Sequence, residues 1–239
     1  VDRDADVNVA AKRIAWAKYF NAGQTCISPD HALVHADVRD RFLVAFTKHV
    51  HTFFGDDPER SPHFARLINA KRFDVVKGYL EHGRVHLGGD HNAAERYIAP
   101  TVLIDVPLDS PPMREEIFGP VLPVLTWTEK EEVLAIVRRN PFPLSAYVFT
   151  SNNATARYFT ERIPFGGGCV NHCLLQFGNP HLPFGGVGTS GMGRYHGQGS
   201  FDAFSHQKSL VTSSTLIDPG VQYAPYSARK EKVLRWVLK

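Results

Sequence analysis

The 239-residue sequence has only three cysteines and no long apolar segment. Three cysteines, Cys26, Cys169 and Cys173, cannot all pair within one chain, which disfavours a disulfide scaffold and favours a reducing compartment such as the cytoplasm. No apolar run approaches the roughly 18 residues that a membrane-spanning helix needs. The sequence therefore predicts neither a small secreted disulfide-rich protein nor a membrane-spanning one.

The sequence also lacks an excess of charge of one sign. It has 27 Lys and Arg against 24 Asp and Glu, for a net charge of +3, and only residues 229–239 form a basic cluster. Nucleic-acid binding would need a basic stripe or a known module, so we expect no nucleic-acid partner. By contrast, 16 Phe, 8 Tyr and 3 Trp supply enough core material for one large domain or two small ones.

Hydrophobic periodicity predicts alternating helices and strands. We expect helices over 4–22, 38–53, 61–81, 130–139 and 152–162. Strands are expected over 31–36, 84–87, 97–106, 121–126 and 145–150, with another running through Asn171 and a last one over 208–213. Residues 178–200 are rich in glycine and are expected to form a loop. This alternation predicts an α/β fold with a largely parallel sheet.

Two patterns that suggest ligand sites do not meet their structural requirements. Residues 186–191 match G-x-G-x-x-G, but a proline-containing segment precedes them where a dinucleotide site needs a strand. Cys169 and Cys173 flank His172, yet zinc sites usually have four ligands in paired short spacings. On a strand the two cysteines would share one face and His172 the other, so we predict a buried pair of thiols and no metal site.

Cys26 differs from the other two cysteines because it follows a predicted helix end, in the polar segment Asn21-Ala22-Gly23-Gln24-Thr25. A thiol on such a loop is within reach of a substrate, and a thiolate is a strong nucleophile when its surroundings stabilise it. A free cysteine is more often a small core residue, so the local sequence leaves both interpretations open.

Four short blocks stand in a fixed order along the chain. They are residues 20–26 (FNAGQTC), 115–120 (EEIFGP), 168–171 (GCVN) and 183–191 (PFGGVGTSG). Together they resemble the signature blocks of the aldehyde dehydrogenase superfamily, and residues 184–206 are most similar to the class 3 enzymes. These relatives act on fatty or aromatic aldehydes with NAD or NADP.

The resemblance implies roles for individual residues. Cys26 would be the catalytic nucleophile, forming a thiohemiacetal and then a thioester with the aldehyde substrate. Glu116 would bind the nicotinamide ribose and Phe118 would lie near the nicotinamide ring. The remaining candidates belong to the substrate site and active-site loop, namely Asn21, Gly23, Gln24, Asn171 and Phe184.

The resemblance also bears on domain organisation. It implies a catalytic domain over 1–194 and a C-terminal arm with a tail over 195–239, in a full-length homodimer. The family's Rossmann-type domain and general-base glutamate precede this region, so the chain alone is expected to be inactive. Residues 233–239 form a short amphipathic segment that leaves a peripheral membrane contact open. The alternatives are a thiol-dependent semialdehyde or acyl-phosphate reductase of the superfamily, and a truncated product that only assembles or binds partners.

Overall fold

Parallel strands form the centre of the first of two structural units, which comprises Val1–Phe204. In the computed structural model, which describes residues 1–238, four strands follow the spatial order β1-β6-β5-β2. β6 (Val121–Trp127) pairs in parallel with β1 (Ala32–His35) and with β5 (Thr101–Ile104), whereas β2 (Arg84–Leu87) is antiparallel to β5. β7 (Ser145–Val148) and β8 (Gly167–Val170) form a parallel pair, and β3 (His91–Asn92) pairs with β4 (Tyr97–Ile98). The predicted α/β fold with a mostly parallel sheet is confirmed.

The first two residues bridge the four-stranded sheet and the β7–β8 pair. The Val1 amino group donates to the Leu33 carbonyl at 2.7 Å, and the His35 N–H donates to the Val1 carbonyl at 2.9 Å. The Asp2 N–H points the other way and donates to the Phe149 carbonyl at 2.9 Å. Successive residues thus bond to opposite neighbours, as residues of a central strand do. The edges of β1 and β7 therefore face each other across this segment.

Helices α1 (Val7–Tyr19) and α2 (Arg39–Phe54) pack against each other over the sheet. The Asp6 side chain caps α1 by accepting a hydrogen bond from the Val9 N–H at 3.0 Å. Val7, Ala10, Ile14 and Ala17 of α1 are buried, and they join residues of α2 and the sheet in one core. The helix predictions for these two segments are confirmed, and this packing fixes the end of α1 from which Cys26 follows.

The helix predicted over 61–81 is wrong in its first part. The structure begins α3 (Ala70–Tyr79) at the Asn69 cap, whose side chain accepts from the Arg72 N–H at 2.8 Å. Ahead of it, the Leu67 N–H donates to the Arg96 carbonyl at 3.0 Å and the Ile68 N–H donates to the Gln24 side chain at 2.9 Å. Because tertiary partners take these backbone groups, the segment cannot use them for helical bonds.

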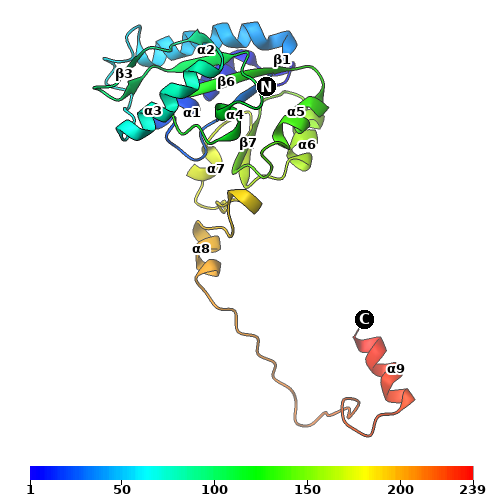
Figure 1. Cartoon of the computed structure of the whole chain (residues 1–239). Coiled ribbons are helices and arrows are strands. Elements are labelled where there is room, and N and C mark those ends of the chain that lie inside the picture. The colour runs from blue at the N-terminus through cyan, green and yellow to red at the C-terminus, as the bar shows by residue number, and fades with distance from the viewer. Residues whose placement is uncertain (239) are drawn as a thin grey trace. The chain divides into compact units, whose positions relative to one another are not determined.

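Helices α5 (Lys130–Val137) and α6 (Asn153–Arg162) lie side by side next to β7 (Figure 1). Trp127, Val133, Leu134, Phe159 and Ile163 form a separate apolar cluster between them and the end of β6. Both helices were expected, with ends that differ by a few residues. They close one side of the region that contains the candidate site.

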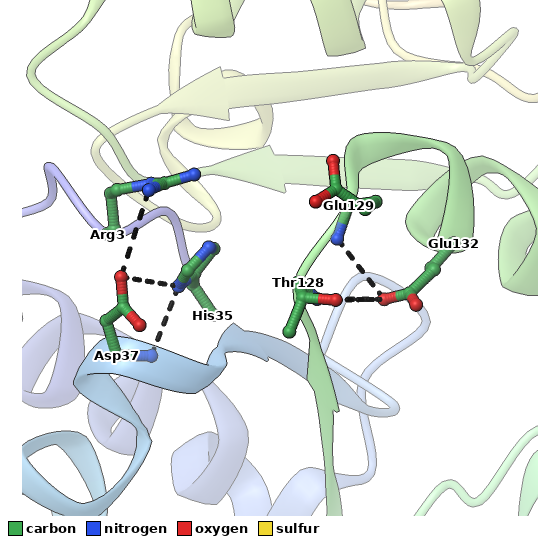
Figure 2. A network of polar contacts seen from close by, with 6 residues as sticks. All are labelled: Arg3, His35, Asp37, Thr128, Glu129 and Glu132. Carbon is green, nitrogen blue, oxygen red and sulfur yellow. Dashed lines mark hydrogen bonds and ion pairs between the residues drawn. The ribbon is translucent and has the colours of Figure 1, made fainter.

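Polar contacts fix the chain where β1 and β6 end (Figure 2). Asp37 contacts His35 at 3.6 Å and Arg3 at 3.9 Å after β1. After β6, the Glu132 carboxylate accepts from the Thr128 N–H at 2.8 Å and the Glu129 N–H at 3.3 Å. The second set is a capping box, which starts α5 directly behind the strand.

The remaining short elements of this unit are α4 (Pro111–Arg114), α7 (Leu175–Gly178), α8 (Gly197–Ala203) and the 3₁₀ turns η1 (Phe20–Gly23), η2 (Ala36–Val38), η3 (Leu80–His82) and η4 (Gly188–Ser190). Residues 178–200 were expected to be a loop throughout. The structure confirms a loop over most of this segment, but α7 reaches Gly178, the short turn η4 lies within it and α8 begins at Gly197.

The second unit, Ser205–Lys239, contains helix α9 (Ala228–Val237). The Ser227 hydroxyl caps it by accepting from the Lys230 N–H at 3.4 Å. Residues 208–213 were expected to be a strand, but within residues 1–238 no strand edge pairs with them, so that prediction is wrong for this chain. The predicted amphipathic segment 233–239 lies largely in α9, and Lys239 is outside the described residues. Across residues 1–238, no helix has the length and apolar character needed to cross a membrane. The domain boundary at 194 and the membrane contact stay predictions.

Candidate active site

Cys26 lies on a sharply turned loop directly after α1 and η1, and its side chain is exposed. Three consecutive residues have left-handed backbone, with φ of 52° at Asn21, 52° at Ala22 and 75° at Gly23. Such conformations are costly for residues other than glycine and occur where the surrounding structure enforces them. The expectation that Cys26 follows a helix end on an accessible loop is confirmed.

Side chains on both sides of Cys26 anchor this loop. The Gln24 amide donates to the Arg66 carbonyl at 3.0 Å and accepts from the Ile68 N–H at 2.9 Å. The Asn21 amide donates to the Gln24 carbonyl at 3.1 Å, and the Ser28 hydroxyl donates to the Lys18 carbonyl at 3.3 Å. Cys26 is therefore held between fixed points, although its thiol is open to solvent.

Gly23 brings the Cys26 loop against residues 115–120. A Cβ at Gly23 would lie 2.2 Å from the Gly119 carbonyl oxygen, which is far inside van der Waals contact. The two backbones touch because Gly23 has no side chain, whereas a Cβ at Gly119 would meet the Val76 side chain at 2.8 Å instead. Two blocks that are distant in sequence thus meet through their glycines.

Gly23→Ala is expected to lower the free energy of unfolding by about 2–4 kcal/mol. About 1 kcal/mol or more comes from the left-handed backbone and about 1–3 kcal/mol from the overlap with Gly119. Gly55→Ala is the matched control, because Gly55 has φ of 78° but a Cβ added there would have no atom within 4 Å. Urea unfolding of both variants measures the difference, and equal losses would contradict the contact with Gly119.

The second loop is clamped through its backbone. The Arg72 guanidinium donates to the Glu116 carbonyl at 2.9 Å and the Phe118 carbonyl at 3.4 Å, and it also contacts the Ile117 carbonyl. The Asp30 carboxylate accepts from the Ile117 N–H at 3.2 Å. Phe118 has φ of 43°, so this clamp maintains an unfavourable backbone conformation. Residues 116–118 are consequently fixed relative to the Cys26 loop.

The two adjacent glutamates have different surroundings. The Tyr79 hydroxyl donates to the Glu115 carboxylate at 2.9 Å, whereas no side chain among residues 1–238 bonds to the Glu116 carboxylate. Burial raises the pKa of Glu116, and the negative charge of Asp30 raises it further. Burial and the hydrogen bond from its hydroxyl to Glu115 raise the pKa of Tyr79 to about 12. The Glu115 carboxylate thus has a side-chain hydrogen-bond partner, whereas the Glu116 carboxylate has none among residues 1–238 and is available to a ligand.

Lys18 places a buried ammonium group beside these acids. Its side chain is fully buried, and its Nζ has no hydrogen-bond partner in the part of the chain that the structure describes. Burial lowers the pKa of Lys18 to about 8, while Asp30 and Glu116 act in the opposite direction. The site therefore places one buried cation, Lys18, close to the carboxylates of Asp30, which is partly buried, and Glu116, which is exposed.

Cys26, Asp30 and Glu116 line one cavity of about 760 Å³. Its apolar lining includes residues of the cluster around α5 and α6, and the facing edges of β1 and β7 form part of its wall. Open strand edges present unpaired backbone donors and acceptors, which favour pairing with an extended segment of chain rather than binding of a small ligand. We therefore assign ligand chemistry to the part of the cavity near Cys26 and Glu116, and not to the whole volume.

The other candidate residues lie outside this lining. The Asn171 amide accepts from the Thr150 N–H at 2.9 Å and donates to the Thr150 carbonyl at 2.8 Å. Phe184 is 9% exposed and packs against Phe177 and Tyr195. Asn21, Gly23, Gln24 and Phe118 shape or support the two loops. The roles that the resemblance gives these residues stay predictions.

The predicted pair of thiols on one strand face is wrong. β8 ends at Val170, and φ of 58° at Asn171 and 65° at Leu174 turns the chain away around Cys173. Only Cys173 is fully buried, and burial raises its pKa. Cys169 is partly exposed, and its thiol donates to the Gln176 amide oxygen at 3.0 Å. Among residues 1–238, no three or more His, Cys, Asp or Glu side chains gather in a way that could hold a metal ion.

The sequence analysis did not identify Lys18, Asp30 and Arg72. Asp30 follows the Cys26 block closely, so its proximity to the loop was open to inference. Lys18 and Arg72 sit in helices as ordinary basic residues, and nothing in their local pattern distinguishes them from solvent-exposed ones. The positions of Lys18 and Arg72 in the site depend on tertiary contacts.

Comparison with known proteins shows the family of the chain. The Aldehyde dehydrogenase family model matches residues 1–210. The chain is 44% identical to a 4,4'-diaponeurosporen-aldehyde dehydrogenase of Staphylococcus aureus, over 96% of this chain and 50% of that protein. It is 42% identical to mouse aldehyde dehydrogenase family 3 member B3, over 100% of this chain and 50% of the relative. The chain thus spans about half the length of these curated relatives.

Solved structures with a similar fold are also aldehyde dehydrogenases. A substrate-bound Staphylococcus aureus AldH superposes with a TM-score of 0.92 at 41% identity, over 100% of this chain and 52% of that one. A Mycobacterium tuberculosis aldehyde dehydrogenase complexed with NAD+ gives a TM-score of 0.76 at 28% identity, over 88% of this chain and 45% of that one. By its sequence and by its fold, the chain belongs to the aldehyde dehydrogenase family.

Proposed function

We propose that this chain is the catalytic domain, with its C-terminal arm, of an NAD(P)-dependent dehydrogenase that oxidises fatty or aromatic aldehydes to carboxylic acids. One observation carries the proposal: Cys26 and Glu116 line one cavity on two loops whose backbones are fixed against each other. The substrate class rests on the resemblance of residues 184–206 to class 3 enzymes and on the similarity to family 3 relatives.

Cys26 supplies the covalent chemistry in this proposal. Its thiolate attacks the aldehyde carbon to form a thiohemiacetal, and the Cys26 backbone N–H stabilises the developing oxyanion. Loss of hydride leaves a thioester, which water cleaves to release the acid. Sulfur suits both steps, because a thiolate is a good nucleophile and then a good leaving group. The fixed loop keeps the thiol and the backbone N–H in one geometry throughout.

The Glu116 carboxylate and the Phe118 ring suit the nicotinamide end of NAD or NADP. When bound, that cofactor supplies a hydride acceptor. The Glu116 carboxylate has no competing side-chain partner among residues 1–238 and is an apt acceptor for ribose hydroxyls, while Phe118 offers an apolar ring on the same clamped loop. Arg72 holds this loop by backbone carbonyls and so leaves the Glu116 carboxylate available.

Other features of the proposal rest on the resemblance. The dinucleotide-binding domain and the general-base glutamate would lie in the half of the relatives that this chain does not span. The intact protein would form a homodimer in the cytoplasm, with a peripheral membrane contact through the C-terminal tail. Because these features lie beyond the described site, each requires its own measurement.

The direct test is an assay of the intact protein. We expect NAD or NADP reduction with medium-chain or aromatic aldehydes, at rates that do not depend on inorganic phosphate. A requirement for phosphate, with formation of an acyl phosphate, would favour the reductase alternative. Absence of turnover with either cofactor, in a folded protein, would favour an assembly or binding role.

Glu116→Gln is expected to alter hydride transfer or cofactor affinity in the intact protein and to leave its melting temperature unchanged, because the carboxylate bonds to no other side chain among residues 1–238. Glu115→Gln is the matched control, since it weakens a partly buried hydrogen bond to Tyr79 and should lower stability instead. Steady-state kinetics and thermal unfolding separate the two. If Glu116→Gln lowers stability and leaves the rate per folded molecule unchanged, Glu116 is structural.

A further inference from the structure

A hydroxyl from β7 supports the backbone directly after the proposed nucleophile. Tyr147 donates from its Oη to the Ile27 carbonyl at 2.8 Å, and Ile27 is 4% exposed. Among residues 1–238, no other hydrogen bond reaches that carbonyl. Gln24 anchors the loop before Cys26 and Ser28 anchors it beyond Ile27, so Tyr147 is the contact from the side of β7.

A second side chain determines the direction of the Tyr147 hydrogen bond. The Gln176 amide nitrogen donates to the Tyr147 Oη at 3.0 Å and to the Ser145 hydroxyl at 3.2 Å. The Gln176 amide oxygen accepts from the Cys169 thiol at 3.0 Å, so each end of this buried amide has partners of the right kind. Because the Tyr147 oxygen accepts from Gln176, its own proton is directed to the Ile27 carbonyl.

The hydroxyl stays protonated at neutral pH. Burial raises the pKa of Tyr147 to about 12, although its hydrogen bond from Gln176 acts in the opposite direction. The contact with the Ile27 carbonyl is therefore a constant feature of the site in the ordinary working range.

We propose that Tyr147 is a positioning residue for the proposed nucleophile, which fixes the Cys26 backbone through Ile27 and is itself oriented by Gln176. The inference rests on the proposed function of Cys26. Acyl transfer to sulfur requires the thiol and the oxyanion-stabilising N–H to be aligned together, whereas simple alkylation requires only a reachable thiolate. Loss of the Tyr147 hydroxyl should thus affect acylation far more than alkylation.

Tyr147→Phe in the intact protein tests this, because it removes the hydroxyl and retains the ring. Tyr158→Phe is the matched control, since the Tyr158 hydroxyl donates to the exposed Glu131 carboxylate at 2.9 Å, outside the cavity lining. Three readouts are compared. They are hydrogen exchange of a peptide covering residues 24–30, acylation of Cys26 by p-nitrophenyl acetate, and alkylation of Cys26 by iodoacetamide.

We expect Tyr147→Phe to speed exchange in residues 24–30, to slow acylation about tenfold, and to change alkylation less than about twofold. Tyr158→Phe should change none of the three. Unchanged exchange, or an equal loss of acylation and alkylation, would overturn the positioning role. If Tyr147→Phe does not fold, Gln176→Leu replaces it, and it should slow acylation in the same direction because the Tyr147 hydroxyl then loses the hydrogen bond from Gln176.

Cys26→Ser separates this inference from the proposed function. If p-nitrophenyl acetate still acylates the Cys26→Ser protein at the wild-type rate, Cys26 is not the acylated group and the proposed function fails. Hydrogen exchange in residues 24–30 does not depend on chemistry at Cys26. It therefore decides the structural effect of Tyr147 in either case.

Discussion

Cys26→Ser in the intact protein is expected to reduce aldehyde oxidation by about 10⁴-fold or more, the scale on which removal of a covalent nucleophile acts. A serine hydroxyl in the same place fits the loop, because the side chain is exposed and similar in size. It is a far weaker nucleophile, however, since it ionises well above neutral pH and no imidazole or amine among residues 1–238 donates to or accepts from position 26. The fold should persist while the chemistry is lost.

Cys169→Ser is the matched control. Like Cys26→Ser, it replaces a thiol with a hydroxyl. The new hydroxyl can still donate to the Gln176 amide oxygen. Turnover should stay close to wild type, and iodoacetamide should still label Cys26. Near-normal turnover of Cys26→Ser, measured as reduction of NAD or NADP, would end the assignment of Cys26 as nucleophile.

The accessible position of Cys26 was predictable because its causes are local. The predicted helix ends in Asn21-Ala22-Gly23, and Asn21 and Gly23 can adopt left-handed backbone, so a turn ahead of Cys26 follows from the sequence. The parallel sheet was predictable for a similar reason, since strands and helices alternate with short connections.

The supports of the site were not predictable, because each joins segments that are far apart in sequence. Gln24 bonds to residues 66 and 68, Arg72 to the carbonyls of 116–118, and Tyr147 to Ile27. The same contacts explain the helix that was wrongly expected over 61–69, whose backbone serves Gln24 and Arg96. Local propensity has no information on such partners.

Residues 208–213 show that local sequence can also predict an element that lacks a partner. Its sequence favours a strand, but a strand is stable only where another edge supplies hydrogen bonds. Within residues 1–238 no edge does so.

Residues 1–239 produced alone are expected not to sustain aldehyde oxidation. Hydride transfer requires the cofactor within about 3–3.5 Å of the reacting carbon, which demands a site that holds the whole dinucleotide. In the proposed site, Glu116 and Phe118 would contact only the nicotinamide end of the cofactor. Among residues 1–238 no strand leads through a glycine-rich turn into a helix, which is the arrangement that binds a pyrophosphate. By the resemblance, the general-base glutamate would also lie in the half of the relatives that this chain does not span.

The isolated chain should still react at sulfur and should tend to associate. Cys26 is exposed, so iodoacetamide or a reactive ester is expected to modify it once per chain. Trp16 and Phe20 are 40% and 53% exposed with ring centroids 6.2 Å apart, an apolar surface that promotes association in water. The assay follows absorbance of reduced NAD or NADP with a medium-chain or aromatic aldehyde, while light scattering or gel filtration follows association. Sustained turnover by residues 1–239, abolished by Cys26→Ser, would mean that this chain itself holds the dinucleotide and the group that activates water, and that the division of labour proposed between the two halves is wrong.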